Sequence, residues 1–357
     1  MSRLLSVLLL LLSACSNLPR HSELGKIERE TAAAHIEQAE AEIAAGDHQT
    51  ALDRLIKLRS VRRLPPDQRL QIEELLMSAS DTLLRGLDSP EADSDDFLDL
   101  YRSNLAPRLK AKAGLQAADR MLAENRPVAA FKQVKRVERD LSINLDRAYA
   151  GDIVGRAGLG MIERTGRYGL VFRYSSRGGE ALEFLVLHYP FDPRCPEAYT
   201  ALVRHYERRH RHDLAIERAE DLIIYHPDHP LAIKMQAYLP KLRLERLERD
   251  DYARSELNQA EFELEYWLER YAGREGSPED EAEVRATLVE ARRRIAENDL
   301  IVARFYDRVD EPQGVRLHAE RALDFAREAG AEDAIAEAER LIARHADASA
   351  PAGDPVP

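Results

Sequence analysis

The sequence has few cysteines, few aromatic residues and no apolar run long enough to cross a bilayer. Its 357 residues include two cysteines, one tryptophan and 6% aromatic side chains. The longest apolar run, Leu4 to Leu12, is about half of the roughly twenty residues that a membrane-spanning helix needs. Acidic residues outnumber basic ones, 64 to 52, and the net charge of −12 argues against nucleic acid binding. We therefore expect neither a transmembrane protein nor a nucleic-acid-binding one.

The start of the sequence has the layout of an export signal. Arg3 supplies a positive charge, the leucine-rich run follows, and small residues close the segment, which is expected to be removed. Within it, Leu12-Ser13-Ala14-Cys15 resembles the lipobox of bacterial lipoproteins. The resemblance implies that residues 1–14 are a cleaved signal peptide, that Cys15 carries a covalent lipid, and that residues 15–30 are a lipidated tether. Cys195 is then left without a partner, so no intrachain disulfide is possible.

The residue after Cys15 bears on which membrane holds the lipid. An aspartate at this position retains many bacterial lipoproteins at the inner membrane, and here the residue is Ser16. By the same resemblance, the protein is expected to be lipid-anchored in the outer membrane and to face the periplasm. Each buried methylene contributes about 0.8 kcal/mol, so more than one acyl chain gives a stable anchor. No other cofactor is expected.

The rest of the composition is typical of helices, because Ala, Leu, Glu and Arg abound while Gly and Pro number 17 each. Apolar residues recur at helical spacing in two stripes, Ile36, Ala39 and Ile43, then Ala51, Leu55 and Leu58. Gly46-Asp47 separates the stripes, which predicts a helix–turn–helix pair. The turn GDHQTA resembles the G-D-Y-x-x-A turn of the tetratricopeptide repeat.

The same apolar spacing recurs further along the chain. Later copies are Ala130, Val134 and Val137, then Ala215, Ala219 and Leu222, then Ala260, Leu264 and Trp267. Pro227 falls where the repeat's terminal proline belongs. Because recurrence is the test of a repeat, we predict an all-α fold of tetratricopeptide-like helix–turn–helix repeats stacked as a superhelical solenoid.

Two breaks suggest how the chain is divided. Residues 86–97 form a predicted acidic loop, and residues 151–169 are glycine-rich and could loosen a junction between two halves. We expect degenerate N-terminal repeats over residues 31–160 and a second repeat domain over residues 161–345. Residues 346–357 lack an apolar face and are expected to be disordered.

The second repeat domain resembles BamD, the tetratricopeptide lipoprotein of the β-barrel assembly machinery. The matching order of motifs is Tyr189-Pro190, Ala198-Tyr199 and Pro227-Asp228-His229-Pro230. Further on, Ala303, Phe305, Tyr306 and Arg308 match that family's A-x-F-Y-x-R stretch. With the lipobox, these matches cover about half of the chain. The sequence departs from the family in having roughly 130 preceding residues of repeat, and in Tyr271-Ala272-Gly273 where Tyr-Pro is expected.

The resemblance implies a scaffold rather than an enzyme. It implies that the later repeats bind the barrel-forming subunit of the assembly machinery and that the earlier ones receive unfolded outer-membrane proteins. Stacked helix pairs offer an extended surface for a peptide or a partner domain. The alternative left open is a lipoprotein scaffold of similar build for another envelope complex, such as cell-wall enzyme recruitment, secretion or polysaccharide export.

Aromatic residues are concentrated in one part of the chain. Ten of the 22 lie between Tyr168 and Tyr238, against four between residues 31 and 165. The candidates for an exposed partner-binding surface are Tyr168, Phe172, Tyr174, Phe191 and Tyr199. Aromatic residues at helical spacing are also ordinary core residues, which is the interpretation favoured for Phe184 and Tyr206.

Four arginines of the later repeats are candidates for the partner surface, because arginine is enriched at interfaces. They are Arg304, Arg308, Arg316 and Arg321. A solvated helix face explains these four residues equally well.

No catalytic or metal site is predicted. Five histidines fall within 25 residues, namely His205, His210, His212, His226 and His229. Zinc needs three or four ligands held in tetrahedral geometry, and no carboxylate or cysteine has suitable spacing to these histidines. Cys195 has no motif around it and is expected to be packed rather than nucleophilic.

Overall fold

The computed structural model describes residues 27–86, 92–103, 105–164, 166–168, 172–247, 254–274 and 278–345. The lipobox, Cys15 and the expected disordered tail therefore lie outside the described residues. The chain forms two compact units, Met1–Ala157 and Gly158–Pro357, which are described separately. The dividing point falls inside the glycine-rich stretch, where residues 151–162 are helical.

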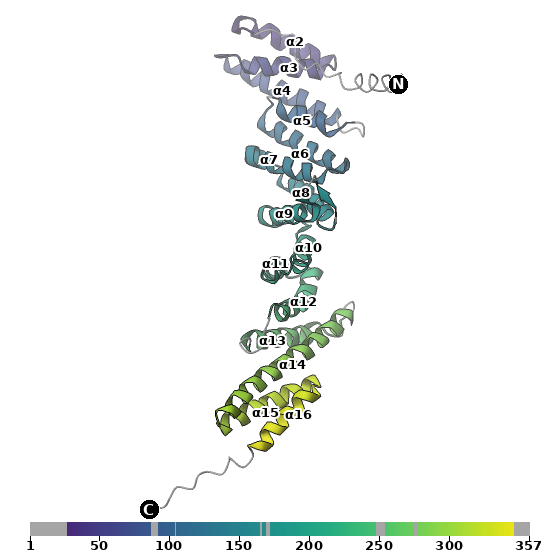
Figure 1. Cartoon of the computed structure of the whole chain (residues 1–357). Helices are drawn as coiled ribbons and strands as arrows, with labels where there is room; N and C mark the ends of the chain where they lie inside the picture. The colour runs from purple at the N-terminus through teal and green to yellow at the C-terminus, as the bar shows by residue number, and fades with distance from the viewer. Residues whose placement is uncertain are drawn as a thin grey trace, which may run out of the picture. The chain divides into compact units, whose positions relative to one another are not determined.

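The described residues are almost entirely helical, as predicted (Figure 1). The first unit contains η1 (Arg29–Thr31), α2 (Ala32–Ala44), α3 (His48–Arg59), α4 (Pro66–Gly86), α5 (Ser94–Arg102), α6 (Pro107–Ala123), α7 (Pro127–Leu141) and η2 (Ser142–Asn144). Helix α8 (Arg147–Ile162) contains the dividing point. The second unit continues with β1 (Arg167–Tyr168), β2 (Phe172–Arg173), α9 (Tyr174–His188), α10 (Cys195–Glu207), α11 (His212–Tyr225), α12 (Pro230–Arg246), α13 (Arg254–Tyr271), α14 (Pro278–Arg308), α15 (Pro312–Ala329) and α16 (Glu332–Arg344).

Five of the described turns between helices share one backbone geometry, and four of them link the two helices of a pair. In these four the residues with positive φ are Gly46 at 82°, Asn125 at 60°, His210 at 54° and Asp310 at 56°. In each turn the next residue's N–H donates to the carbonyl five residues earlier, at 2.8 to 3.1 Å: Asp47 to Glu42, Arg126 to Met121, Arg211 to Tyr206 and Glu311 to Tyr306. This bond closes a helix that is followed by a left-handed residue, and it recurs after α15, where Gly330 has φ 65° and the Ala331 N–H donates to the Ala326 carbonyl at 2.9 Å. The shared turn shows that the helix pairs are repeats of one unit.

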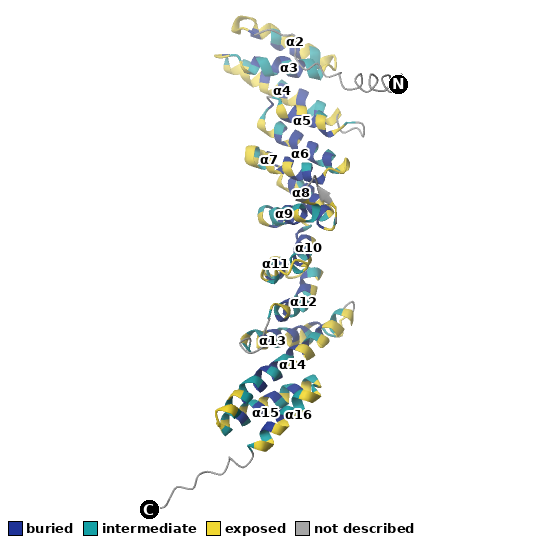
Figure 2. Cartoon of the chain, in the orientation of Figure 1, coloured by how far each residue is buried: buried dark blue, intermediate teal, exposed yellow. Residues whose placement is uncertain are grey.

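The predicted apolar stripes form the core of these pairs (Figure 2). The twelve residues of the four later stripes are each at most 1% exposed: Ala51, Leu55, Leu58, Ala130, Val134, Val137, Ala215, Ala219, Leu222, Ala260, Leu264 and Trp267. Ile36 and Ala39 are also buried, whereas Ile43 is half-buried. The 3.6-residue period of a helix places such residues on one side, where the partner helix covers them. The predicted all-α repeat fold is confirmed.

Neighbouring pairs pack mainly through the second helix of one pair and the first helix of the next, and their first helices also contact one another. We call α2, α4, α6, α8, α10, α12 and α14 the A helices, and the helix after each its B helix. In the first unit α2 contacts α4 and α4 contacts α6, and in the second α10 contacts α12 and α12 contacts α14. Within each unit the A helices therefore lie side by side and build one surface, the A-helix face.

Two glycines allow the end of α8 and the start of α9 to approach closely. A Cβ added to Gly178 would lie 2.4 Å from the backbone nitrogen of Ile162 and 2.5 Å from its Cα. A Cβ on Gly158 would lie 2.4 Å from Cδ2 of Leu182. All three distances are far below van der Waals contact, so this packing requires glycine at both positions.

Part of the predicted acidic loop is helical instead. Residues 87–91 are outside the described part, but the prediction is wrong from Ser94, where α5 begins. The reason is a capping box: the Asp93 carboxylate accepts from the N–H groups of Asp95 and Asp96, and the Asp96 side chain accepts from the N–H of Asp93. Acidic residues thus start this helix rather than solvate a loop.

Two further findings complete the fold. The only strands in the described residues are β1 and β2, which form an antiparallel pair of two residues each, with Tyr168 opposite Phe172. None of the described helices combines the length and the apolar character that crossing a membrane requires.

Candidate partner-binding groove

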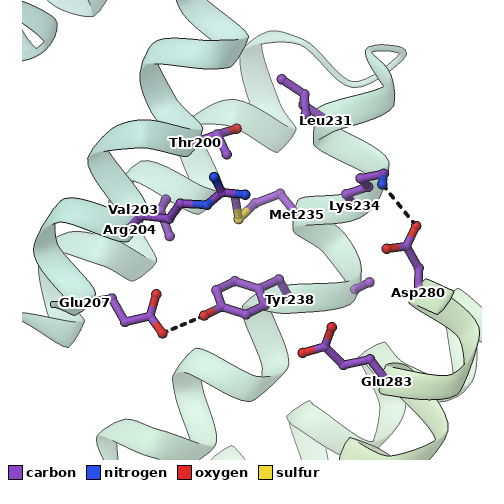
Figure 3. A pocket seen from close by; sticks show the side chains of 11 residues that line it. Thr200, Val203, Arg204, Glu207, Leu231, Lys234, Met235, Tyr238, Asp280 and Glu283 are labelled. Carbon is purple, nitrogen blue, oxygen red and sulfur yellow. Dashed lines mark hydrogen bonds and ion pairs between the residues drawn. The ribbon is translucent and has the colours of Figure 1, made fainter. Parts of the chain in front are cut away.

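The A-helix face of the second unit is hollowed between α10, α12 and α14 (Figure 3). The hollow has a volume of about 380 Å³ and is walled by Thr200, Arg204 and Glu207 of α10 and by Lys234 and Tyr238 of α12. Asp280 and Glu283 close it from α14. A second hollow of about 350 Å³ extends towards the end of α8 and shares Thr200, Arg204 and Leu231 with the first. We call the two together the A-helix groove.

Helical spacing explains why these side chains share a wall. Thr200, Arg204 and Glu207 are separated by one helical turn each, and Leu231, Met235 and Tyr238 repeat this spacing on α12. The start of α12 is fixed by Pro230 in its first turn and by the His229 ring, whose Nδ1 accepts from the Leu231 N–H at 3.2 Å. Both helices therefore present matching stripes to the groove.

The acidic side chains of the first hollow all have partners. The Tyr238 hydroxyl donates to Glu207 Oε1 at 2.6 Å, and Lys234 Nζ lies 3.6 Å from Asp280 Oδ2. Lys241 Nζ donates to Glu283 Oε1 at 2.9 Å. Burial, and next its bond to Glu207, raise the pKa of Tyr238 above the ordinary value, so its hydroxyl stays a donor at neutral pH.

Arg204 is the exception among the charges of the first hollow. Its side chain is exposed and has neither an ion pair nor a hydrogen bond within the part of the chain that the structure describes. It lies where the two hollows join, above the buried Val203. A guanidinium in this position can bind a carboxylate or two carbonyl oxygens of an entering chain.

The aromatic candidates from the sequence do not form this groove. Phe191 is 93% exposed and Tyr174 is half-buried under Arg164, whose guanidinium carbon lies 5.4 Å from the ring centroid. The side chains of Tyr168 and Phe172 are outside the described part. The expectation of exposure is wrong for Tyr199, which is 2% exposed because it lies on the core side of α10 with Cys195 and Leu202.

The four arginine candidates differ in what holds them. Arg304 pairs with Glu337 and Glu297 at 2.7 and 2.9 Å, and Arg316 lies 3.5 Å from Glu320. Arg321 Nε is 3.9 Å from the buried Asp299. Arg308 is exposed at the end of α14, with no ion pair among the described residues. Of the four, Arg308 is the one whose charge is most available to a partner.

The histidines and Cys195 do not converge on a site. His205 is buried, and burial, then Arg209 and Arg208, lower its pKa to about 4. His210 is an exposed turn residue. The described residues contain no group of three or more His, Cys, Asp or Glu that could hold a metal ion. The Cys195 thiol donates to the Tyr189 carbonyl at 3.2 Å, and burial raises its pKa to about 12.

The residues of the groove are not among the binding residues predicted from the sequence. Thr200, Arg204, Lys234 and Tyr238 stand on two A helices at the same spacing, and that repetition was a signal available in the sequence. The sequence does not indicate that α10 and α12 lie side by side, because this contact joins residues about thirty positions apart in the chain.

The comparisons with known proteins show no family for this chain. The sequence matches no protein-family profile, and it matches no curated protein. Among solved structures, a putative kinesin light chain with tetratricopeptide-like repeats from Podosopora anserina is 14% identical, with a TM-score of 0.30 over 62% of this chain and 98% of that one. A tetratricopeptide repeat protein from Parabacteroides merdae is 11% identical, with a TM-score of 0.30 over 87% and 98%.

These TM-scores are too low to support an argument, so the assignment depends on the molecule's own features. They are the four equivalent turns, the buried stripe that follows each turn, and the contacts between A helices. On these features the chain is an all-α protein built of tetratricopeptide-like helix–turn–helix repeats.

Proposed function

We propose that the chain is a non-catalytic scaffold that binds an extended segment of a partner protein in its A-helix groove. The observation that carries the proposal is the unpaired Arg204, which lies where the two hollows join and beside a first hollow whose other charges are paired. An entering backbone supplies carbonyl oxygens along its whole length, and the apolar residues Leu231 and Met235 of the lining accept side chains of many kinds. Such a site binds polypeptide with little demand on sequence.

The proposed partners follow from the sequence resemblance to BamD. The protein is a lipoprotein anchored at Cys15 in the outer membrane and facing the periplasm, where the A-helix groove receives unfolded outer-membrane proteins. The later repeats, with Arg308 the most available of their arginines, bind the barrel-forming subunit of the assembly machinery. The location of the groove within residues 159–283 agrees with this division, because it belongs to the earlier part of the matching region.

Charge reversal at Arg204 tests the groove. Arg204→Glu is expected to weaken binding of a urea-unfolded outer-membrane porin, diluted from denaturant, by about tenfold, because a central arginine is replaced by a repelling carboxylate. Fluorescence anisotropy of the labelled porin gives the Kd. The matched control is Arg340→Glu, an exposed position on α16 outside the groove, which should leave the Kd unchanged. Equal Kd values for wild type and Arg204→Glu would contradict the proposal.

Removal of the lipidated cysteine tests the anchor. Cys15→Ala is expected to move the protein from the membrane fraction to the soluble fraction, because the lipid on Cys15 is the proposed attachment. None of the described helices is long and apolar enough to span the membrane. Fractionation after a salt wash measures the distribution. Cys195→Ala, which removes the buried cysteine, should stay with the membrane. Retention of Cys15→Ala after the wash would show that lipid does not hold the protein.

A second candidate function, a scaffold for another envelope complex, is favoured by the first unit. Its A helices α4 and α6 frame their own hollow of about 810 Å³, lined by Met77, Asp81, Arg108 and Lys112. Purification of the tagged protein in mild detergent distinguishes the two candidates. Recovery of the barrel-forming subunit in comparable amount supports the first, and recovery of cell-wall or export proteins in its place supports the second.

A further inference from the structure

The second unit has another hollow, on the side of the B helix α13. Its volume is about 570 Å³, and it shares no lining residue with the A-helix groove. Its walls are Ile233 and Leu239 of α12 and the aromatic rings of Phe262, Tyr266 and Tyr271 of α13. Trp267 anchors the inner wall, where its indole N–H donates to the Ile233 carbonyl at 3.1 Å.

Two of the aromatic rings that line the hollow are exposed to solvent. Phe262 is 67% exposed and Tyr266 is 46% exposed, and their rings lie almost parallel with centroids 6.5 Å apart. Covering apolar surface contributes about 25 cal/mol per Å², so an exposed ring pair beside a hollow is a favourable contact for an incoming side chain.

The same face of α13 ends in a cation that lacks a carboxylate. Arg270 Nη1 donates to the Tyr266 hydroxyl at 2.8 Å, and its guanidinium lies 5.6 Å from the centroid of Tyr271. No acidic partner of Arg270 exists among the described residues. On the neighbouring face of the same helix the opposite holds, since Glu261 and Glu265 both pair with Arg292 of α14. Two acidic residues line the hollow: Glu263 is already bound by Arg243, and Asp228 is an exposed residue of the turn before α12.

The spacing along α13 matches an extended chain. Phe262, Tyr266 and Arg270 are four residues apart, a rise of about 6 Å per step in a helix. An extended strand places residues i, i+2 and i+4 on one side at steps of roughly 6.6 Å. Two alternate apolar side chains of such a strand therefore align with the two rings, and the next alternate side chain aligns with the guanidinium.

We propose that this hollow is a second docking site, which binds an extended partner segment of the pattern apolar-x-apolar-x-acidic. The two apolar side chains lie against Phe262 and Tyr266, and the carboxylate pairs with Arg270. The site is independent of the A-helix groove, so the chain binds two segments at once, and the inference holds whatever the partner of the groove is.

Peptide binding to the full chain tests the proposal. The probe is the labelled, end-capped peptide Ser-Phe-Thr-Phe-Thr-Glu-Ser, measured by fluorescence anisotropy. We expect binding with a micromolar Kd, weakened at least tenfold for the permuted control Ser-Phe-Phe-Thr-Thr-Glu-Ser. Tyr266→Ala should weaken the first peptide at least tenfold, whereas Phe305→Ala, at another exposed aromatic position that is 51% exposed, should not change the Kd.

A charge swap gives the sharpest test. Arg270→Glu should raise the Kd of the glutamate peptide at least tenfold and lower the Kd of the corresponding lysine peptide by a similar factor. A folding defect does not produce this reversal. Arg340→Glu, at an exposed position on α16 outside both binding sites, should leave both Kd values unchanged. Equal affinity for the ordered and permuted peptides, no preference reversal, or absence of binding at 100 μM peptide would each overturn the proposal. A dimer that dissociates in Tyr266→Ala, without peptide binding, would overturn it in favour of a second copy of the chain.

Discussion

Replacing Asp299 by alanine is expected to lower the free energy of unfolding by about 3 kcal/mol. Asp299 lies in the middle of α14 with a side chain that is 3% exposed. Its Oδ2 accepts from Arg254 Nη1 of α13 at 2.6 Å, and its Oδ1 lies 3.0 Å from Nδ1 of His318 on α15. One carboxylate thus joins three helices, and its loss leaves a largely buried guanidinium without its anion. The partial exposure of Arg254, 25%, places the effect at the low end for buried pairs.

Urea unfolding followed by circular dichroism measures this effect, and hydrogen exchange localises it. Because repeats contact only their neighbours, faster exchange should be confined to α13, α14 and α15. Asp324→Ala, at an exposed position on α15, is the matched control and should change stability by less than about 0.5 kcal/mol. In the Arg254→Met background the Asp299→Ala cost should fall. An undiminished cost there would show that the cation is not what Asp299 satisfies.

Two glycine substitutions are expected to have opposite signs. Gly178→Ala should destabilise the second unit by about 1–3 kcal/mol, because the new methyl group meets the backbone of Ile162 and α8 must move away from α9. Gly160→Ala should stabilise it by about 0.5–1 kcal/mol, because nothing lies within 4 Å of the new Cβ and alanine favours the helix.

The midpoint of thermal unfolding, read at the transition of the second unit, gives both signs. The pair controls for the general effect of replacing glycine by alanine, since only the surroundings of the two positions differ. Stabilisation by Gly178→Ala would mean that the close approach of α8 and α9 is not a feature of the folded protein.

Most of the fold could be predicted because its signal is local. The stripe Ala215, Ala219 and Leu222 marks the buried side of a helix through spacing alone, and the structure confirms it. The prediction that Tyr199 is exposed was wrong, although helical spacing places it on the buried side of α10. It follows the buried Cys195 by four residues and precedes the buried Leu202 by three. A high local density of aromatic residues suggested a surface there, but periodicity along α10 was the better guide.

The groove was less predictable for a physical reason. An unpaired charge cannot be recognised in a sequence in which nearly every arginine has acidic residues nearby. Arg218 and Arg204 look alike as letters, yet Arg218 lies among Glu183, Glu217 and Asp221, whereas Arg204 has no such partner among the described residues. Only the packing of one pair against the next decides which arginines are satisfied within the chain and which remain for a partner.

The four equivalent turns show how a repeat protein can change its sequence while the backbone conformation of its turns stays the same. The position after α2, α6, α10 and α14 requires a left-handed torsion, and glycine, asparagine, histidine and aspartate all meet it here. Residue-by-residue scoring rewards Gly46 and penalises the other three, although the backbone treats all four alike. Repeat proteins of this kind can therefore keep the same backbone torsion angles in their turns after their sequences have diverged. This agrees with a chain whose sequence matches no protein-family profile.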